Sequence, residues 1–206
     1  MENEDENELQ FNNIKVILLG NSGVGKTSLI NIVTGGKFDE NENITVTAFY
    51  AMKKIRCKKQ DYILNIWDTT GQEKLRQLTK IFYTNSKIVI FVYDITNKES
   101  FTDLNYWIND IKERMGDNLV KGVVANKADL FLKETVKKEE GEEYATSINA
   151  KFLDFSAKED DPSKFESFLV DLLVEYLKNS GRNFIDDSFS LNRKHPRKSK
   201  REKNCC

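Results

Sequence analysis

A phosphate-binding loop is indicated by eight residues that follow the first apolar run of the chain. Residues 20–27 read Gly-Asn-Ser-Gly-Val-Gly-Lys-Thr, which fits the pattern G-x-x-x-x-G-K-[S/T]. Glycines let backbone N–H groups turn toward phosphate oxygens, and the start of a following helix adds partial positive charge. Lys26 can reach the β- and γ-phosphates, and the Thr27 hydroxyl can ligate magnesium. A glycine turn made only for packing needs neither side chain, so the sequence predicts a nucleotide site.

A second group of polar residues follows the strand-like run that ends at Trp67. Residues 68–73 read Asp-Thr-Thr-Gly-Gln-Glu, and Asp68 could hold the water shell of a metal ion. Gly71 would let a backbone amide approach the γ-phosphate, and Gln72 could orient an attacking water. Alone this pattern also fits an ordinary polar loop. The phosphate loop upstream favours the catalytic interpretation.

A third motif points to the base of the nucleotide. Residues 126–129 read Asn-Lys-Ala-Asp and follow an apolar strand-like run. The Asp129 carboxylate could accept hydrogen bonds from a ring N–H and an exocyclic amino group, a pair that guanine offers and adenine does not. Farther on, residues 156–158, Ser-Ala-Lys, could supply a backbone N–H to the base. The motif therefore favours a guanine nucleotide over ATP.

The elements that must position these motifs alternate between strands and helices. We expect strands at about 14–19, 49–57, 62–67, 88–93, 122–125 and near 152, and helices at about 26–33, 100–115, 134–148 and 162–179. The polar residues 58–61 would turn an antiparallel hairpin, while Asp161 and Pro162 mark the start of the last helix. This order predicts an α/β fold, a P-loop domain whose mainly parallel six-stranded sheet carries helices on both faces. Such sheets bind ligands at the carboxyl ends of their strands.

Composition and charge favour one domain with two polar tails. The chain has 206 residues, of which 39% are hydrophobic, enough for one sizeable core. Its net charge is −1, but acidic residues crowd the start and basic residues crowd the end. We expect a disordered acidic tail over 1–12, a folded domain over 13–180 and a flexible basic tail over 181–206. With no signal-peptide pattern and no run of about 18 apolar residues, the chain is expected to remain in the cytosol.

The cysteines predict lipidation. Cys57 lies in a strand-like stretch, whereas Cys205 and Cys206 are the last two residues, so a disulfide framework is not expected. Lipid attachment to the terminal pair would place the upstream basic run at anionic headgroups. By composition alone, that run could also be a solvated tail or a nuclear-import signal.

Taken together, these motifs in this order resemble the Ras superfamily of small GTPases, and within it the Rab family, over about residues 12 to 180. The resemblance rests on Trp-Asp-Thr-Thr-Gly-Gln-Glu at 67–73, Val-Tyr-Asp-Ile-Thr at 92–96, Glu-Ser-Phe at 99–101 and the terminal Cys-Cys. It implies that Phe38 packs against guanine, that Asn126, Lys127 and Asp129 hold the base, and that Ala157 donates its amide to it. It also implies that Thr45 closes over magnesium and the γ-phosphate.

The full set of predicted site residues combines the motifs with this resemblance. The nucleotide-binding residues are Ser22, Gly23, Val24, Gly25, Lys26, Thr27, Ser28, Phe38, Thr45, Asp68, Gly71, Asn126, Lys127, Asp129, Ser156, Ala157 and Lys158. The catalytic residues are Gln72, Lys26 and Thr45, the Mg²⁺ ligands are Thr27, Thr45 and Asp68, and the lipidation sites are Cys205 and Cys206.

The first switch segment departs from the Rab pattern. Where the family has T-I-G-x-x-F, residues 45–50 read Thr-Val-Thr-Ala-Phe-Tyr, so the glycine is replaced by Thr47 and the aromatic by Tyr50. A β-branched residue there restricts the backbone, and partners would meet different side chains. By the same alignment Tyr50, Trp67 and Phe82 form either an exposed aromatic group or partial core packing. Trp107 is expected in the core.

The resemblance implies a slow GTPase that switches between GTP and GDP and recruits effectors in vesicle traffic. Its expected partners are an exchange factor, a GTPase-activating protein and effectors at the switch segments, together with the prenylation machinery and a GDP-dissociation inhibitor. We expect a monomer that cycles between cytosol and the cytoplasmic face of an intracellular membrane, without nucleic acid. Two alternatives remain: a nucleotide-binding scaffold that does not cycle, and a P-loop kinase or ATPase, which the motif at 126–129 opposes.

Overall fold

A computed structural model describes residues 13–39, 49–57, 60–69 and 80–181 of the chain. It contains one six-stranded sheet in the order β2-β3-β1-β4-β5-β6. In chain order the elements are β1 (Asn13–Leu19), α2 (Lys26–Val33), β2 (Phe49–Cys57), β3 (Gln60–Asp68), η2 (Lys80–Tyr83), β4 (Ile88–Asp94), α4 (Lys98–Thr102), α5 (Leu104–Met115), β5 (Val120–Asn126), η3 (Ala128–Lys133), α6 (Lys138–Ser147), β6 (Ala150–Phe155) and α7 (Pro162–Asn179). The predicted fold class is confirmed.

The sheet is parallel except at one edge. β1 lies between β3 and β4 and pairs parallel with both, and β5 and β6 extend the parallel part. β2 pairs antiparallel with β3, as expected for a hairpin, with Tyr50 opposite Trp67. β4 is buried at every position because helices cover both of its faces, whereas β3, nearer the edge, alternates between buried and half-buried residues.

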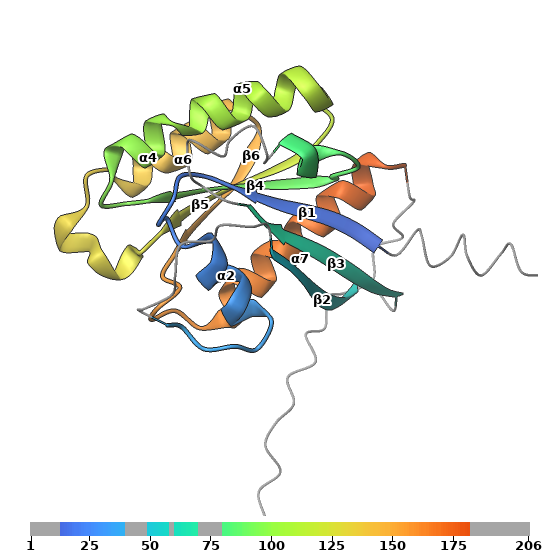
Figure 1. Cartoon of the computed structure of the whole chain (residues 1–206), viewed down its shortest axis with the longest axis horizontal. Coiled ribbons are helices and arrows are strands. Elements are labelled where there is room, and N and C mark those ends of the chain that lie inside the picture. The colour runs from blue at the N-terminus through green and yellow to red at the C-terminus, as the bar shows by residue number, and fades with distance from the viewer. Residues whose placement is uncertain (1–12, 40–48, 58–59, 70–79, 182–206) are drawn as a thin grey trace, which may run out of the picture.

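Helices form a layer on each face of this sheet. Figure 1 shows α2 and α7 on one face and α4, α5 and α6 on the other, and each layer encloses its own buried apolar cluster. Phe165 and Leu169 of α7 belong to the first cluster, and Trp107 of α5 belongs to the second. Trp107 is fully buried, so its predicted core position is confirmed.

The last helix begins where the sequence predicts. The Asp161 side chain accepts a hydrogen bond of 2.8 Å from the Ser163 N–H, and Pro162 occupies the first helical turn. An aspartate cap satisfies one of the amide groups that a helix start leaves unpaired, and proline lacks the donor that would need a partner there. Local residues alone therefore define this boundary.

Two helical predictions differ from the structure. The single helix expected at 100–115 is two, α4 and α5, separated at Asp103. The helix expected at 134–148 begins only at residue 138. Its expected start is not helical because the Ile95 carbonyl accepts the backbone N–H groups of Thr135 and Val136, at 2.7 and 3.2 Å.

Among the described residues, no helix is long and apolar enough to cross a membrane.

Candidate functional site

The predicted phosphate loop lies between the carboxyl end of β1 and the start of α2. Gly25 caps α2 with a φ of 94°, and Gly20 has a φ of 151°. A Cβ on Gly20 would lie 2.1 Å from the carbonyl oxygen of Val92 in β4, and a Cβ on Gly25 would lie 2.3 Å from Asn126 Nδ2. Only glycine allows this loop to pass so close to the neighbouring strands.

Lys26 is held inside the curve of the loop. Its Nζ donates hydrogen bonds to the carbonyl oxygens of Gly20 and Asn21, at 2.9 and 2.8 Å. The side chain is buried, and burial lowers its pKa from 10.5 to about 8, although the negative charge of Asp68 opposes the shift. A buried ammonium group of this kind is suited to a strongly anionic ligand.

Two of the predicted metal ligands lie beside this lysine. The Thr27 hydroxyl donates to Asp68 Oδ2 at 2.5 Å, and Asp68 is completely buried. Asp68 reaches this place because β3 pairs with β1 in a register that sets it opposite Leu18. The neighbouring Thr69 hydroxyl donates to the Leu18 carbonyl at 2.6 Å. A hydroxyl and a carboxylate are hard oxygen donors, and therefore fit Mg²⁺.

The predicted base motif is joined to the phosphate loop by one side chain. Asn126, at the end of β5, donates from Nδ2 to the Val24 carbonyl at 2.8 Å. Its Oδ1 accepts the backbone N–H of Ala157 at 3.2 Å. Asn126 thus connects the loops that follow β1, β5 and β6, although 102 and 31 residues separate it from its two partners.

Asp129 is oriented by the loop that follows β6. Its Oδ1 accepts the Ser156 hydroxyl at 2.6 Å, and the same hydroxyl oxygen accepts the backbone N–H groups of Lys158 and Glu159. The Ser156 N–H donates to Asp160 Oδ2 at 2.8 Å. The Ser156 hydroxyl therefore orients the Asp129 carboxylate.

Lys127 has a partner that the motif search missed. Its backbone is left-handed, with φ 66°, and its Nζ lies 2.7 Å from Asp94 Oδ2 at the end of β4. Asp94 Oδ1 in turn accepts the backbone N–H and the hydroxyl of Thr96. Asp94 lies within the Val-Tyr-Asp-Ile-Thr stretch, so its place at the end of an apolar run was the available signal.

The remaining predicted residues occupy different places. Ser22 and Gly23 are exposed in the loop, Ser28 is buried in α2, and Phe38 is half-buried against the first apolar cluster. The described residues do not include Thr45, Gly71, Gln72, Cys205 and Cys206. They also do not include the predicted tail at 1–12, and of the predicted tail at 181–206 they include only residue 181.

The three aromatic residues named from the alignment form a row at the edge of the sheet. The Trp67 ring lies 5.3 Å from the Tyr50 ring and 5.4 Å from the Phe82 ring, measured between centroids. Tyr50 is exposed, whereas Trp67 and Phe82 are half-buried. Both expectations hold in part, because Tyr50 is open to solvent whereas Trp67 packs against the second apolar cluster.

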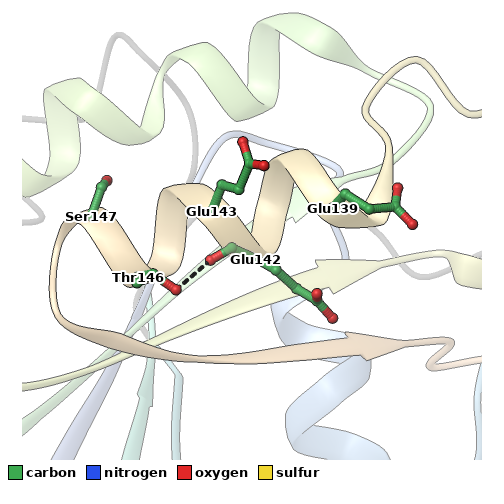
Figure 2. A pocket seen from close by; sticks show the side chains of 5 residues that line it. All are labelled: Glu139, Glu142, Glu143, Thr146 and Ser147. Carbon is green, nitrogen blue, oxygen red and sulfur yellow. Dashed lines mark hydrogen bonds between the residues drawn. The ribbon is translucent and has the colours of Figure 1, made fainter.

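A surface hollow also occurs on α6. Figure 2 shows it lined by Glu139, Glu142, Glu143, Thr146 and Ser147, with the Thr146 hydroxyl donating to the Glu142 carbonyl at 2.9 Å. None of these residues belongs to the predicted site, and three carboxylates would repel a phosphate group. The hollow is therefore not part of the candidate nucleotide site.

Comparisons with known proteins agree with this geometry. The Ras family profile matches residues 15–174. The chain is 32% identical to the Ras-related protein Rab-30 of Homo sapiens over 176 residues, which cover 85% of this chain and 86% of the relative. It is 36% identical to RabC of Dictyostelium discoideum over 171 residues, 82% and 86% of the two chains. It is 37% identical to human Rab-22A over 145 residues, 70% and 75% of the two chains. The chain therefore belongs to the Ras family and is a small GTPase of the Rab type.

Proposed function

We propose that this Rab-type GTPase binds GTP and GDP across the loops that follow β1, β5 and β6, and acts as a switch in vesicle-mediated membrane traffic. The observation that carries the assignment is the pair of hydrogen bonds made by Asn126, to the Val24 carbonyl and from the Ala157 amide. They bring the phosphate motif and the base motifs into one continuous surface at the carboxyl ends of parallel strands, where α/β sheets bind ligands.

Each part of the site has a distinct task in this proposal. Asp129 accepts hydrogen bonds from the guanine edge, and Ser156 keeps its carboxylate in place. Lys26 neutralises charge on the β- and γ-phosphates, and the loop amides donate to their oxygens. Adenine lacks the donor pair that Asp129 requires, so ATP would leave this carboxylate without hydrogen bonds from the base.

Thr27 and Asp68 would hold Mg²⁺, with Thr45 as a further ligand in the GTP state. The ion would supply additional positive charge to the phosphates. Gln72 would orient the attacking water without taking its proton. Because these residues act by positioning and charge neutralisation, we expect slow intrinsic hydrolysis that an activating protein accelerates.

Membrane attachment belongs to the same proposal. Prenyl groups on Cys205 and Cys206 would anchor the protein to a cytoplasmic membrane face, with the basic run at 193–203 adding attraction to anionic lipids. A GDP-dissociation inhibitor, an exchange factor and effectors would then control cycling. Replacing both cysteines with serine should move the protein from the membrane fraction of cells to the soluble fraction, and an unchanged distribution would contradict the anchor.

Single-turnover hydrolysis tests the enzymatic part. Protein loaded with GTP and Mg²⁺ should produce GDP slowly, Gln72→Leu should be slower by at least about tenfold, and ATP should not be hydrolysed. Gln60→Leu is the matched control, because Gln60 lies at the opposite end of β3 from Asp68 and should leave the rate unchanged. Equal rates for wild type and Gln72→Leu would contradict the role of Gln72, and equal use of ATP would contradict the role of Asp129.

A further inference from the structure

Asn21 is a variable position of the phosphate-loop pattern, yet its side chain leaves the loop and is bound by another helix. Asn21 Nδ2 donates to Asp103 Oδ2 at 2.9 Å, and Asn21 Oδ1 accepts the indole N–H of Trp107 at 3.4 Å. The donor and the acceptor of one amide are thus both used by residues at the start of α5. We call this group of three side chains the α5 clamp.

Asp103 contributes its carboxylate to the clamp in place of the usual helix cap. It is the residue directly before α5, where an aspartate side chain normally accepts an N–H from the first turn of its own helix. Asp103 makes no such capping bond to α5, and its Oδ2 accepts the amide of Asn21 across 82 residues of sequence. The break between α4 and α5 falls at this same residue.

Trp107 gives the clamp a rigid base. Its side chain is completely buried in the second apolar cluster, and its ring packs edge-on against Tyr106 at 5.3 Å. Because the ring is enclosed by closely packed neighbours, the core sets the direction of its N–H. The clamp therefore connects the phosphate loop to the closely packed second apolar cluster.

The backbone of Asn21 is what this arrangement fixes in place. Its carbonyl, together with that of Gly20, accepts the two hydrogen bonds from Lys26 Nζ. We propose that Asn21 is a positioning residue, and that the α5 clamp holds this part of the loop, and through it the Lys26 ammonium, in the geometry that retains the phosphates. Breaking the clamp would speed the release of nucleotide. The inference rests on the proposed phosphate-binding role of residues 20–27.

The sharpest test exchanges the amide of Asn21 and the carboxylate of Asp103 between the two positions. Asn21→Asp would set two carboxylates against each other at hydrogen-bonding distance, and like charges there repel. Adding Asp103→Asn would restore the pair, because the amide at position 103 could donate to the carboxylate at position 21. The indole N–H of Trp107 would keep its acceptor in both proteins.

The measurement is the release of a fluorescent GDP analogue into excess unlabelled GDP with Mg²⁺. We expect Asn21→Asp to release it about tenfold faster than wild type, and the double variant to fall within about twofold of wild type. Asn109→Asp makes the same chemical change on the exposed surface of α5 and should release it at the wild-type rate. Thermal unfolding of each loaded protein reports on the fold separately.

The outcomes are distinguishable. A wild-type release rate for Asn21→Asp, or a double variant that releases as fast as the single one, would overturn the inference. If Asn21→Asp does not fold, Trp107→Phe, which keeps a buried ring and removes the N–H, should release the analogue about threefold faster, and no change would overturn the clamp. Wild type that fails to bind the analogue at all would instead contradict the proposed function.

Discussion

The Lys26 side chain is buried. Its Nζ donates hydrogen bonds to two backbone carbonyls, those of Gly20 and Asn21. Burial lowers its pKa from 10.5 to about 8 because the charged form loses its water. Burial of this charge is expected to lower the stability of the nucleotide-free protein. In the proposed function, bound phosphates would offset that cost, a conflict between stability and function that is common at active sites.

At this scale we predict that Lys26→Met stabilises the nucleotide-free protein by about 1–3 kcal/mol while abolishing nucleotide binding. Chemical denaturation of the nucleotide-free proteins measures the first effect, and binding of a fluorescent GDP analogue measures the second. Lys112→Met, at an exposed lysine of α5, should change neither quantity. A Lys26→Met protein less stable than wild type would show that the two carbonyl contacts outweigh the cost of burying the charge.

The same substitution has a definite pH dependence. The folded protein releases the Lys26 proton near pH 8, whereas the unfolded chain keeps it to about pH 10.5. Between these values the unfolded state binds more protons than the folded state. The free energy of unfolding of wild type therefore increases as the pH rises through this range. Below pH 8 both states are charged and the full cost of burial is present. The advantage of Lys26→Met should therefore be largest below pH 8 and shrink as pH approaches 10.5.

At the scale of the element, α6 lies against the sheet through a glycine. A Cβ on Gly141 would be 2.3 Å from the Tyr93 hydroxyl oxygen and 2.8 Å from the Phe152 ring. The Tyr93 hydroxyl is buried, without a hydrogen-bond partner among the described residues, and burial raises its pKa. Close approach of α6 to β4 thus depends on the missing side chain at position 141.

We predict that Gly141→Ala lowers stability by about 1–2 kcal/mol, even though alanine in a helix normally gains about 1 kcal/mol over glycine. Tyr93→Phe should be neutral or stabilising by up to about 1 kcal/mol, because it removes an unpaired buried hydroxyl. In the Tyr93→Phe protein, Gly141→Ala should cost about 1 kcal/mol less than in wild type. If the changes in the free energy of unfolding caused by the two substitutions are additive, the Tyr93 hydroxyl is not the cause of the destabilisation.

Ser147→Ala is a suitable control for this cycle, because Ser147 lies on the exposed side of the same helix. It should change the free energy of unfolding by less than about 0.5 kcal/mol. A larger change would mean that α6 responds to substitution in general rather than to the loss of space beside Tyr93.

At the scale of the whole molecule, the site is assembled from loops that belong to different strands, so ligand binding and folding are coupled. GDP with Mg²⁺ at about a thousand times its Kd should stabilise the native state by about 4 kcal/mol. For a domain of this size that corresponds to a rise in Tm of about 8–16 °C. ATP with Mg²⁺ should give no such rise. Equal shifts with both nucleotides would contradict recognition of guanine.

Asp129→Ala should lose most of the GDP-dependent rise in Tm, because the base would lose its carboxylate acceptor. Asp171→Ala, at an exposed aspartate of α7, should keep the rise seen in wild type. Differential scanning calorimetry of wild type and both variants, each with and without GDP, separates the loss of binding from a loss of intrinsic stability.

Local chemistry explains why much of the fold was predictable. The helix at 26–33 and the strand at 49–57 were predicted with the bounds that the structure has, and Asp161 and Pro162 mark the start of α7 by capping alone. Glycine spacing, caps and hydrophobic periodicity are properties of neighbouring residues, so a single sequence displays them. The mainly parallel character of the sheet was predicted from the alternation of strands and helices, whereas the order of its strands was not.

The sequence by itself determined which residues we propose as nucleotide contacts, because the phosphate and base motifs are short and each requires its own chemistry. Only the tertiary structure decided how those motifs are held. Asp94 reaches Lys127, Asn126 joins Val24 to Ala157, the Ile95 carbonyl keeps 135–136 out of a helix, and Asp103 turns from its own helix to Asn21. These partners lie far apart in the chain, and sequence patterns do not report which distant polar groups folding will bring within hydrogen-bonding distance.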